Sequence, residues 1–352
     1  IAFISCNLMV CRLQNRMGGK VFMKILITGI TGFVGSHLAE YILKMDEGHE
    51  IYGLCRWRSP KDNIASIYNK IYLLDGDLCD LSSLIRTLET VKPDIIFHLA
   101  AQSYVLTSFN SPIQTLWANV LGTTNLLEAV RITKINPLIH ICSSSEVYGQ
   151  VTEADVPIKE TCPFKPASPY AVSKVGEDMV ALQYWLSYGI KTIRTRMFTH
   201  TGPRRGDVFA LSFFAKQIAA GELGLGEAVI RVGNLKSVRT ICDVRDAVRA
   251  YWLLISKCKA GDVYNIGGNQ TMTIADALDM LLSFSEKRFE VRVDTELIRP
   301  SDVTLQIPCI DKFRVETGWE PEIKIEKTLE DLLNYWREEL RVYPWKALTV
   351  LK

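Results

Sequence analysis

Two stretches in the middle of the chain carry side chains that can move protons. The first is SPYAVSK at 168–174, in which Tyr170 and Lys174 are four residues apart. Residues at that spacing share one face of a helix, and Ser168 followed by Pro169 is typical of a helix start. A tyrosine with its ordinary pKa of about 10 is a poor base at neutral pH, but a nearby ammonium group and a positive helix end favour the phenolate. The pair predicts acid–base chemistry, with a chance surface pair as the alternative.

The second stretch is CSSSEVYG at 142–149, directly after an apolar run that is typical of a strand. Ser144 and Glu146 place a hydroxyl and a carboxylate at the carboxyl end of that strand. A carboxylate in this position, facing a bound ligand, is well placed to transfer protons. The alternative is that the serines cap a turn and Glu146 lies in solvent.

A glycine-rich turn near the start of the chain predicts a dinucleotide site. The sequence GITGFVG at 29–35 follows a predicted strand and precedes a helix that we expect to begin at Ser36. Gly29, Gly32 and Gly35 allow a tight turn, close approach of the backbone to a pyrophosphate, and packing of the helix on the sheet. Their place between a strand and a helix is what this binding mode requires.

The end of the second predicted strand indicates which dinucleotide is bound. NAD sites place an acidic residue about 20 positions past the glycines, whereas a 2′-phosphate calls for arginine. The stretch LCRWR at 54–58 has no carboxylate and carries Arg56 and Arg58, which predicts NADP. The alternative is that both arginines are solvated loop charges. Asp77, after the third strand, is placed to bind the adenine, although an aspartate there also suits a simple turn.

The elements that hold these side chains alternate between short β-rich runs and amphipathic stretches. We expect strands over 24–28, 50–55, 71–74, 94–100, 138–143 and 191–197, and helices over 36–45, 81–91 and 117–132. Strands joined by helical crossovers form a parallel sheet. The sequence predicts an α/β fold, a Rossmann-type doubly wound parallel sheet with a smaller mixed α/β C-terminal lobe that binds the substrate over the carboxyl ends of the strands.

The alternation weakens after residue 198, which suggests a division of the chain. We expect residues 1–22 to be an N-terminal extension outside the fold, 23–198 the NADP-binding domain, 199–341 mainly the substrate lobe, and 342–352 a tail. The clearest elements of the lobe are helices over 209–220, 274–284 and 329–340 and a strand over 263–266.

The overall composition excludes several classes of protein. The chain has 352 residues, 48% of them hydrophobic, which is typical of a globular protein with two domains. With 41 Lys and Arg against 39 Asp and Glu, nothing favours nucleic acid or a membrane as partner. The apolar run at 1–10 is too short to span a bilayer. The nine cysteines are scattered without any CxxC pair, which predicts no metal site and a reducing, cytoplasmic location.

Several motifs together resemble one enzyme family. They are GITG at 29–32, LAAQS at 99–103, SSSEVYG at 143–149, PRRG at 203–206, GNL at 233–235 and RPSDV at 299–303. From residue 23 to about residue 341 the chain resembles the extended short-chain dehydrogenases/reductases, and most closely the GDP-mannose 4,6-dehydratases. Ser145, where dehydratases for thymidine-linked glucose carry an Asp, favours the mannose branch.

The resemblance implies a role for each matched residue. The catalytic set falls on Ser144, Glu146, Tyr170 and Lys174. Cofactor contacts fall on the glycine turn, the two arginines, two later loops and the catalytic pair: Gly29, Thr31, Gly32, Phe33, Val34, Gly35, Arg56, Arg58, Asp77, Leu78, Leu99, Ala100, Ala101, Tyr170 and Lys174. Contacts to the nucleotide sugar fall on Asn119, Thr199, Arg204, Arg239, Arg299 and Asp302, of which the arginines suit a diphosphate. Family members pair through helices of the nucleotide domain, which implies a homodimer or homotetramer.

The reaction implied is the conversion of GDP-mannose to its 4-keto-6-deoxy product by internal hydride transfer and loss of water. Glu146 is the discriminating residue, since only the step at C5 needs a carboxylate. Phe33 and Val34 depart from the family's GITGQDGS, and Thr199 departs from its FNH. Residues 207–219 and 260–267 look more like the GDP-4-keto-6-deoxymannose reductases. The alternatives are such a reductase, another nucleotide-sugar 4,6-dehydratase or 4-epimerase, and a non-enzymatic NADP-binding redox sensor.

Overall fold

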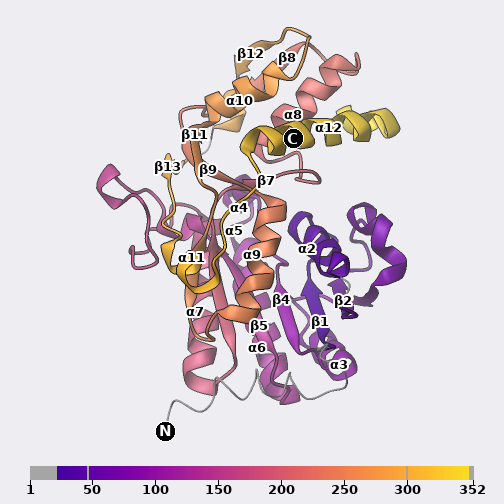
Figure 1. Ribbon diagram of the computed structural model, residues 1–352, viewed down its shortest axis with the longest axis vertical. Coiled ribbons are helices and arrows are strands. Elements are labelled where there is room, and N and C mark those ends of the chain that lie inside the picture. Colours follow the sequence, from indigo (N-terminus) through magenta and orange to yellow (C-terminus); the bar gives the residue numbers. More distant parts are fainter. Residues whose placement is uncertain (1–21, 46, 299, 349–352) are drawn as a thin grey trace.

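A seven-stranded parallel sheet forms the larger part of the molecule. The computed structural model describes residues 22–45, 47–298 and 300–348, so most of the expected extension, with Cys6 and Cys11, lies outside the described residues. The strand order is β10-β6-β5-β4-β1-β2-β3 (Figure 1), and the predicted doubly wound sheet is confirmed. The strands are β1 (Lys24–Thr28), β2 (Glu50–Cys55), β3 (Tyr72–Asp75), β4 (Ile95–His98), β5 (Leu138–Ser144), β6 (Thr192–Met197) and β10 (Val263–Ile266).

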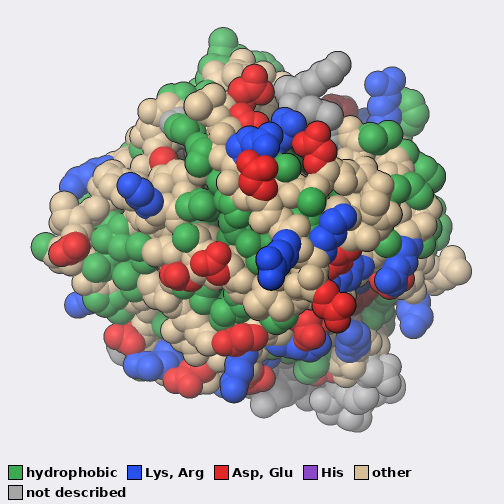
Figure 2. All heavy atoms as spheres, turned by 90° about the horizontal axis from the view of Figure 1, so that it is seen from above, with side chains coloured by type: hydrophobic (Ala, Val, Ile, Leu, Met, Phe, Trp, Pro, Cys, Tyr) green, Lys and Arg blue, Asp and Glu red, His purple; other side chains and the backbone are tan. Residues whose placement is uncertain are grey.

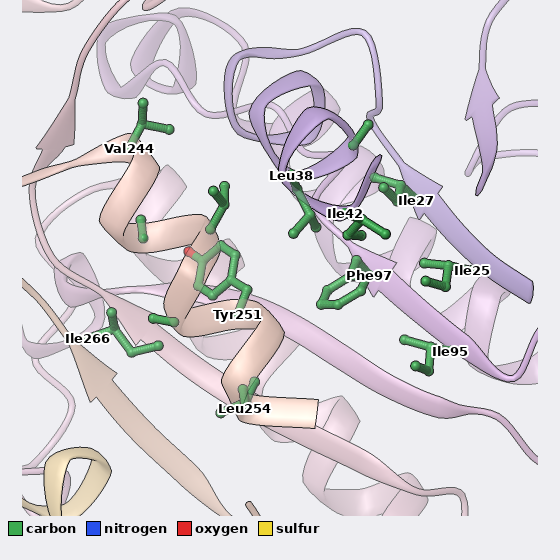
Figure 3. Packing of buried hydrophobic residues seen from close by; sticks show 14 of the residues in the cluster. Ile25, Ile27, Leu38, Ile42, Ile95, Phe97, Val244, Tyr251, Leu254 and Ile266 are labelled. Atoms are coloured by element: carbon green, nitrogen blue, oxygen red, sulfur yellow. The ribbon is translucent and has the colours of Figure 1, made fainter. Parts of the chain in front are cut away.

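Alternate residues of the central strands enter two separate cores. Ile25 and Ile27 of β1 pack on one face of the sheet, while Leu26 packs on the other. Phe97 and Ile96 of β4 divide in the same way. Because side chains alternate across a strand, a strand that is apolar throughout is buried on both faces. Figure 3 shows the first of these cores, between the sheet and two helices.

Helices cover both faces of the sheet. On one face lie α2 (Phe33–Lys44) and α9 (Val244–Lys257), which pack against each other. On the other face lie α3 (Leu81–Val91), α6 (Gly122–Thr133) and α7 (Pro169–Tyr188). The connecting segments contain the short elements η1 (Asp62–Lys70), α4 (Val105–Asn110), α5 (Pro112–Leu116), η2 (Trp117–Leu121), η3 (Ser145–Tyr148) and η4 (Glu153–Asp155).

The C-terminal half of the chain contributes to the large sheet as well as to the second lobe. β10 has the expected bounds, but it pairs in parallel with β6 and completes the sheet. A parallel neighbour needs a crossover connection, and α9, which the sequence reading did not anticipate, lies on that connection. α11 (Asp311–Thr317) also packs against β10. The segment 199–341 therefore contributes β10, α9 and α11 to the larger part of the molecule.

The remaining elements form a smaller mixed lobe beyond one end of the sheet (Figure 1). Its core lies between α8 (Ala210–Glu222), α10 (Ile274–Ser283) and α12 (Ile325–Val342), which confirms the helices expected there. Two small sheets complete it, one with β7 (His200–Thr201), β9 (Val238–Asp243), β11 (Gln270–Thr273) and β13 (Leu305–Gln306), the other with β8 (Val229–Val232) and β12 (Glu290–Val293). The short η5 (Thr295–Leu297) follows β12, and η6 (Pro344–Leu348) packs against α12 and α8.

The surface carries charges of both signs side by side. On the face shown in Figure 2, Lys and Arg side chains are interspersed with Asp and Glu side chains, as the near-zero net charge predicts. Within the described residues, no helix is long and apolar enough to cross a membrane. The seven described cysteines are all free thiols.

Two histidines are buried in the central strands as neutral rings. Both ring nitrogens of His98 are bonded, Nδ1 to Thr28 Oγ1 at 2.9 Å and Nε2 to Thr123 Oγ1 at 3.0 Å. His140 Nε2 lies 2.8 Å from Thr195 Oγ1. Burial lowers the pKa of each histidine to about 3, with the Lys174 charge contributing.

We expect these histidines to make the protein sensitive to mild acid. Because an unfolded histidine has a pKa of about 6.5, protons bind the unfolded chain first, and stability is lost as pH falls below that value towards the folded pKa. The free energy of unfolding should fall by about 1.4 kcal/mol per pH unit for each histidine, measured by urea unfolding. In His98→Asn, the slope of the free energy of unfolding against pH should be smaller by about 1.4 kcal/mol per pH unit. An unchanged slope would contradict the view that His98 is buried as a neutral ring.

Candidate active site

The glycine turn leaves the first turn of α2 open to a ligand. Gly29 has φ +72°, and a Cβ on Gly35 would lie 2.3 Å from the Gly29 carbonyl oxygen, so both positions require glycine. The N-cap residue is Gly32, and no side chain caps the helix there. N–H groups in the first turn of a helix lack partners within the helix and bind phosphate oxygens. The turn therefore fits the pyrophosphate of a dinucleotide.

The loop after β4 is tied to the glycine turn. Thr28 Oγ1 accepts hydrogen bonds from the N–H groups of Leu99 (3.1 Å) and Ala100 (3.2 Å), and Ala101 follows in the same loop. A Cβ on Gly29 would lie 2.9 Å from Ala100 Cα. Asn63 Nδ2 donates to the Thr31 carbonyl at 3.0 Å, which holds the turn from the other side. These contacts bring two of the predicted cofactor segments together.

The two arginines after β2 lie on the surface next to the glycine turn. Arg56 and Arg58 are exposed, and the Arg58 guanidinium lies 4.5 Å from the centre of the Trp57 ring. Asp77 follows the neighbouring strand β3, where one carboxylate oxygen accepts a hydrogen bond from Cys79 N–H at 2.9 Å. Leu78 also follows β3, and its carbonyl accepts a bond from Asn125. Both segments lie at the carboxyl edge of the sheet, as expected.

α7 and β5 bring together the two stretches that the sequence predicts to be catalytic. Ser168 caps α7 by accepting from Ala171 N–H at 3.0 Å, and Ser143 Oγ donates to the Lys174 carbonyl at 3.0 Å, which ties the helix to the strand. Tyr170 is 8% exposed and Ser144 9%, and their hydroxyl groups are hydrogen-bonded. Side chains 26 positions apart in sequence thus meet at one point.

Lys174 is held by the carboxylate of Glu177, which is not among the predicted site residues. Lys174 Nζ lies 2.7 Å from Glu177 Oε2 and 3.0 Å from the Cys142 carbonyl, and 5.9 Å from the centre of the Tyr170 ring. Burial opposes its charge and is the largest single effect, but Glu177, Tyr170 and Cys142 together outweigh it and raise the pKa of the lysine. The ammonium group is therefore charged at neutral pH.

The electrostatics of Tyr170 differ from the sequence-based expectation. Burial raises the pKa of Tyr170 above its ordinary value, and the opposing effects of the Lys174 charge and the Ser144 hydrogen bond do not cancel it. The expected lowering of the pKa followed from the neighbouring charges. The desolvation of the buried phenolate depends on the fold, so the sequence does not reveal it. Lys174 and Ser144 therefore only reduce the rise in the Tyr170 pKa that burial causes.

Glu146 lies in η3, two residues past the end of β5. Its N–H donates to Ser144 Oγ at 3.2 Å, and its carboxylate oxygen Oε1 accepts from Gln306 Nε2 at 3.3 Å. Gln306 belongs to β13 of the smaller lobe and also accepts from Ser145 Oγ at 3.1 Å. Glu146 is partly exposed and stands two residues after Ser144, which is hydrogen-bonded to Tyr170. Its carboxylate therefore suits a second proton-transfer group.

Among the predicted sugar contacts, Asn119 is enclosed by protein. It is fully buried, and its amide bonds to both the N–H and the carbonyl of Gln102 and to Ser173 Oγ. Asn119 therefore joins η2 to α7. Thr199 follows β6 and is partly exposed. Its backbone carbonyl accepts a hydrogen bond from Cys242 N–H at 2.9 Å.

The two neighbouring arginines of PRRG point to different places. Arg204, the predicted contact, lies 2.6 Å from Glu40 of α2. Arg205 lies between Phe33 and Phe209, 5.1 Å and 3.5 Å from their ring centres. Burial lowers the pKa of Arg205 to about 10, while its interaction with Tyr170 opposes the change. Arg205 is charged at neutral pH and lies near Tyr170.

The predicted nucleotide contacts in the smaller lobe cluster around β9 and β13. Arg239 is mostly buried, donates to the carbonyl groups of Val238 and Val303, and lies 4.0 Å from Asp302. Asp302 in turn accepts from Asn234 Nδ2 at 2.8 Å and from Ser237 Oγ at 3.1 Å. The remaining prediction, Arg299, lies outside the described residues.

Three residues of the site were missed. Glu177 could have been suspected, because it stands three positions after Lys174 on the same helix. Arg205 directly follows Arg204, the contact predicted from the same PRRG motif. The backbone turns at Arg204, which has φ +70°. Gln306 is 160 positions from Glu146, and no local pattern marks it.

A parallel sheet with a glycine-rich turn before its first helix, a Tyr–Lys pair on one helix and a hydroxyl at the end of β5 defines an extended short-chain dehydrogenase/reductase. The family model described as GDP-mannose 4,6 dehydratase matches residues 26–332. The chain belongs to this family.

Individual relatives cover nearly the whole chain. A GDP-mannose 4,6-dehydratase of Yersinia enterocolitica is 34% identical, with 88% of this chain and 92% of the relative covered. A GDP-6-deoxy-D-mannose reductase of Pseudomonas aeruginosa is 33% identical, with 90% and 98% covered. The solved structure of RMD from Pseudomonas aeruginosa complexed with NADPH has a TM-score of 0.78 and 32% identity, with 90% of this chain and 99% of that chain covered.

Proposed function

We propose that this protein is a GDP-mannose 4,6-dehydratase that converts GDP-mannose to GDP-4-keto-6-deoxymannose. The observation that carries the proposal is the placement of Glu146 at the carboxyl end of β5. Its backbone N–H bonds to Ser144 Oγ, which is hydrogen-bonded to Tyr170, and Gln306 holds its carboxylate. The hydroxyl pair serves chemistry at O4, and the carboxylate serves a second proton transfer that simple oxidation or reduction does not need. The family model and the Yersinia relative support the same substrate.

NADP is the proposed cofactor. Arg56 and Arg58 are exposed at the end of β2, where a 2′-phosphate would lie, and the stretch 54–58 has no carboxylate. The first turn of α2 suits the pyrophosphate, and Lys174 with Tyr170 suits the nicotinamide ribose. The structure of RMD with NADPH supports this choice. When bound, NADP supplies reversible hydride transfer, out of C4 and later into C6.

The residues of the chain handle the protons. Tyr170 Oη, held by Ser144 and stabilised as phenolate by the Lys174 charge, takes the proton from the sugar O4 as a carbonyl group forms at C4. That carbonyl group makes the hydrogen on C5 acidic, and Glu146 takes it as a proton. The Glu146 proton then passes to the leaving O6, so that water departs as the C5–C6 double bond forms. Addition of the hydride at C6 and delivery to C5 of the proton that Tyr170 took from O4 complete the 6-deoxy product, and both residues return to their starting states.

Incubation of the protein with GDP-mannose and a catalytic amount of NADP tests the proposal. We expect complete conversion to the 4-keto-6-deoxy sugar with no net change in the cofactor. The second candidate, a GDP-4-keto-6-deoxymannose reductase, is favoured by the relative from Pseudomonas aeruginosa. It would leave GDP-mannose unchanged and would consume one NADPH for each 4-keto sugar reduced.

The proposed assembly is a homodimer, or a homotetramer built from such dimers. α7 carries exposed Val172, Met179 and Leu186 at seven-residue spacing. The adjoining α5 and η2 carry exposed Ile113 and Trp117. Apolar stripes on adjacent helices suit pairing with a second copy. The free thiols of the described cysteines support the expected cytoplasmic location.

Charge in the helix stripe is expected to separate the subunits. Leu186 is 72% exposed, and Leu186→Asp should lower the mass in sedimentation equilibrium from that of a dimer or tetramer towards that of one chain. Val315→Asp is the matched control, because Val315 is 82% exposed on α11. If both variants keep the parent mass, the stripe is not the interface.

A further inference from the structure

Gln306 joins the smaller lobe to the carboxylate of Glu146. The side chain is 2% exposed, and its amide is engaged at both ends. Ser145 Oγ donates to its Oε1 at 3.1 Å, and its Nε2 donates to Glu146 Oε1 at 3.3 Å. Among the hydrogen bonds between described residues, the bond from Gln306 Nε2 is the one that the Glu146 carboxylate accepts.

The segment around Gln306 is held on both sides. Before it, the Thr304 carbonyl accepts from Val238 N–H at 2.7 Å, and after it the Ile307 carbonyl accepts from Ile158 N–H at 2.8 Å. Gln150 adds two hydrogen bonds to Thr304. The strand is therefore attached both to β9 and to the segment that follows η3, which leaves the glutamine little freedom to move.

The hydrogen bond from Ser145 decides the orientation of the amide. A hydroxyl donor on Oε1 directs the amide NH₂ group towards Glu146, and an ionised carboxylate can only accept. A donor on one carboxylate oxygen fixes the rotation of the group and leaves the other oxygen for the substrate. A general base needs such placement, because misplacement by about 1 Å can cost about 100-fold in rate.

We propose that Gln306 is a positioning residue, whose amide holds the Glu146 carboxylate in the orientation that removes the C5 proton. The proposal rests on the proposed dehydratase function. It also gives Ser145 a role, since this hydroxyl keeps the amide from turning. The contact makes placement of the base depend on the smaller lobe, which also carries the expected nucleotide contacts.

Gln306→Leu removes the amide while keeping a side chain of similar volume. We expect kcat for dehydration of GDP-mannose to fall about 100-fold, with KM within about twofold of the parent value. With substrate deuterated at C5, the isotope effect on kcat should be at least as large as in the parent, because the C5 step becomes limiting. Gln150→Leu is the matched control, since Gln150 supports the same segment without touching Glu146, and it should retain the parent kcat.

Gln306→Glu provides a second test that does not depend on volume. A carboxyl group there can donate to Glu146 only when protonated, and two ionised carboxylates repel. Relative to the parent, the kcat of this variant should therefore fall as pH rises. A kcat of Gln306→Leu within about twofold of the parent, an equal loss in Gln150→Leu, or a pH-independent ratio for Gln306→Glu would overturn the inference. If the parent itself does not dehydrate GDP-mannose, the proposed function fails, and this inference with it.

Discussion

Glu146→Gln is expected to lower the rate of dehydration by about 10²- to 10⁴-fold, the contribution typical of a positioned general base. Glutamine keeps the size of the side chain and its contact with Gln306, but it cannot take the proton from C5 or deliver it to O6. Formation of 4-keto-6-deoxy sugar from GDP-mannose, followed by chromatography, measures the loss. The dissociation constant for NADP should stay at the parent value, since Glu146 is not among the expected cofactor contacts.

The control for Glu146 is another glutamate in the segment that follows. Glu153 is exposed in η4, and Glu153→Gln should keep the parent rate. Parent-like activity in Glu146→Gln would remove the carboxylate from the reaction. It would also remove the main argument for elimination over simple reduction, because the reductase candidate needs no base at C5.

Tyr170→Phe is expected to slow the earlier step at O4 and so to lower the rate by a similar 10²- to 10⁴-fold. The variant loses the hydroxyl that accepts the O4 proton while Ser144 and Lys174 remain. Because burial raises the pKa of Tyr170, the phenolate fraction grows with pH, and the parent rate should increase from neutral to alkaline pH. Ser144→Ala should displace that rise to higher pH, since the hydrogen bond that favours the phenolate is lost.

The two catalytic variants should differ in a second measurement. Glu146→Gln retains the groups for chemistry at O4, so mixing with GDP-mannose and NADP should still give absorbance of the reduced nicotinamide. Tyr170→Phe should give none. Tyr72→Phe on the exposed edge strand β3 serves as the control and should match the parent. Equal absorbance in both catalytic variants would contradict this division of roles.

Local sequence determined most of the sheet and half of the active site. β1 and β2 have the bounds expected from their apolar runs, and α7 begins where Ser168 and Pro169 predict. Helix starts, tight turns and strand alternation depend on residues within a few positions of one another, so a sequence pattern is enough to reveal them. The Tyr170–Lys174 pair is a local feature of this kind.

Tertiary structure decided what lies around those residues. β10 was recognised as a strand, but only the packed fold makes it the edge of the large sheet. The direction of the Tyr170 pKa shift depends on desolvation. The fold also gives Arg204 and Arg205 different neighbours, Glu40 for the first and Tyr170 for the second. Gln306 reaches Glu146 because β13 pairs with β9. Burial and long-range pairing arise from the sum of many contacts between distant segments, and no short stretch of sequence contains that sum.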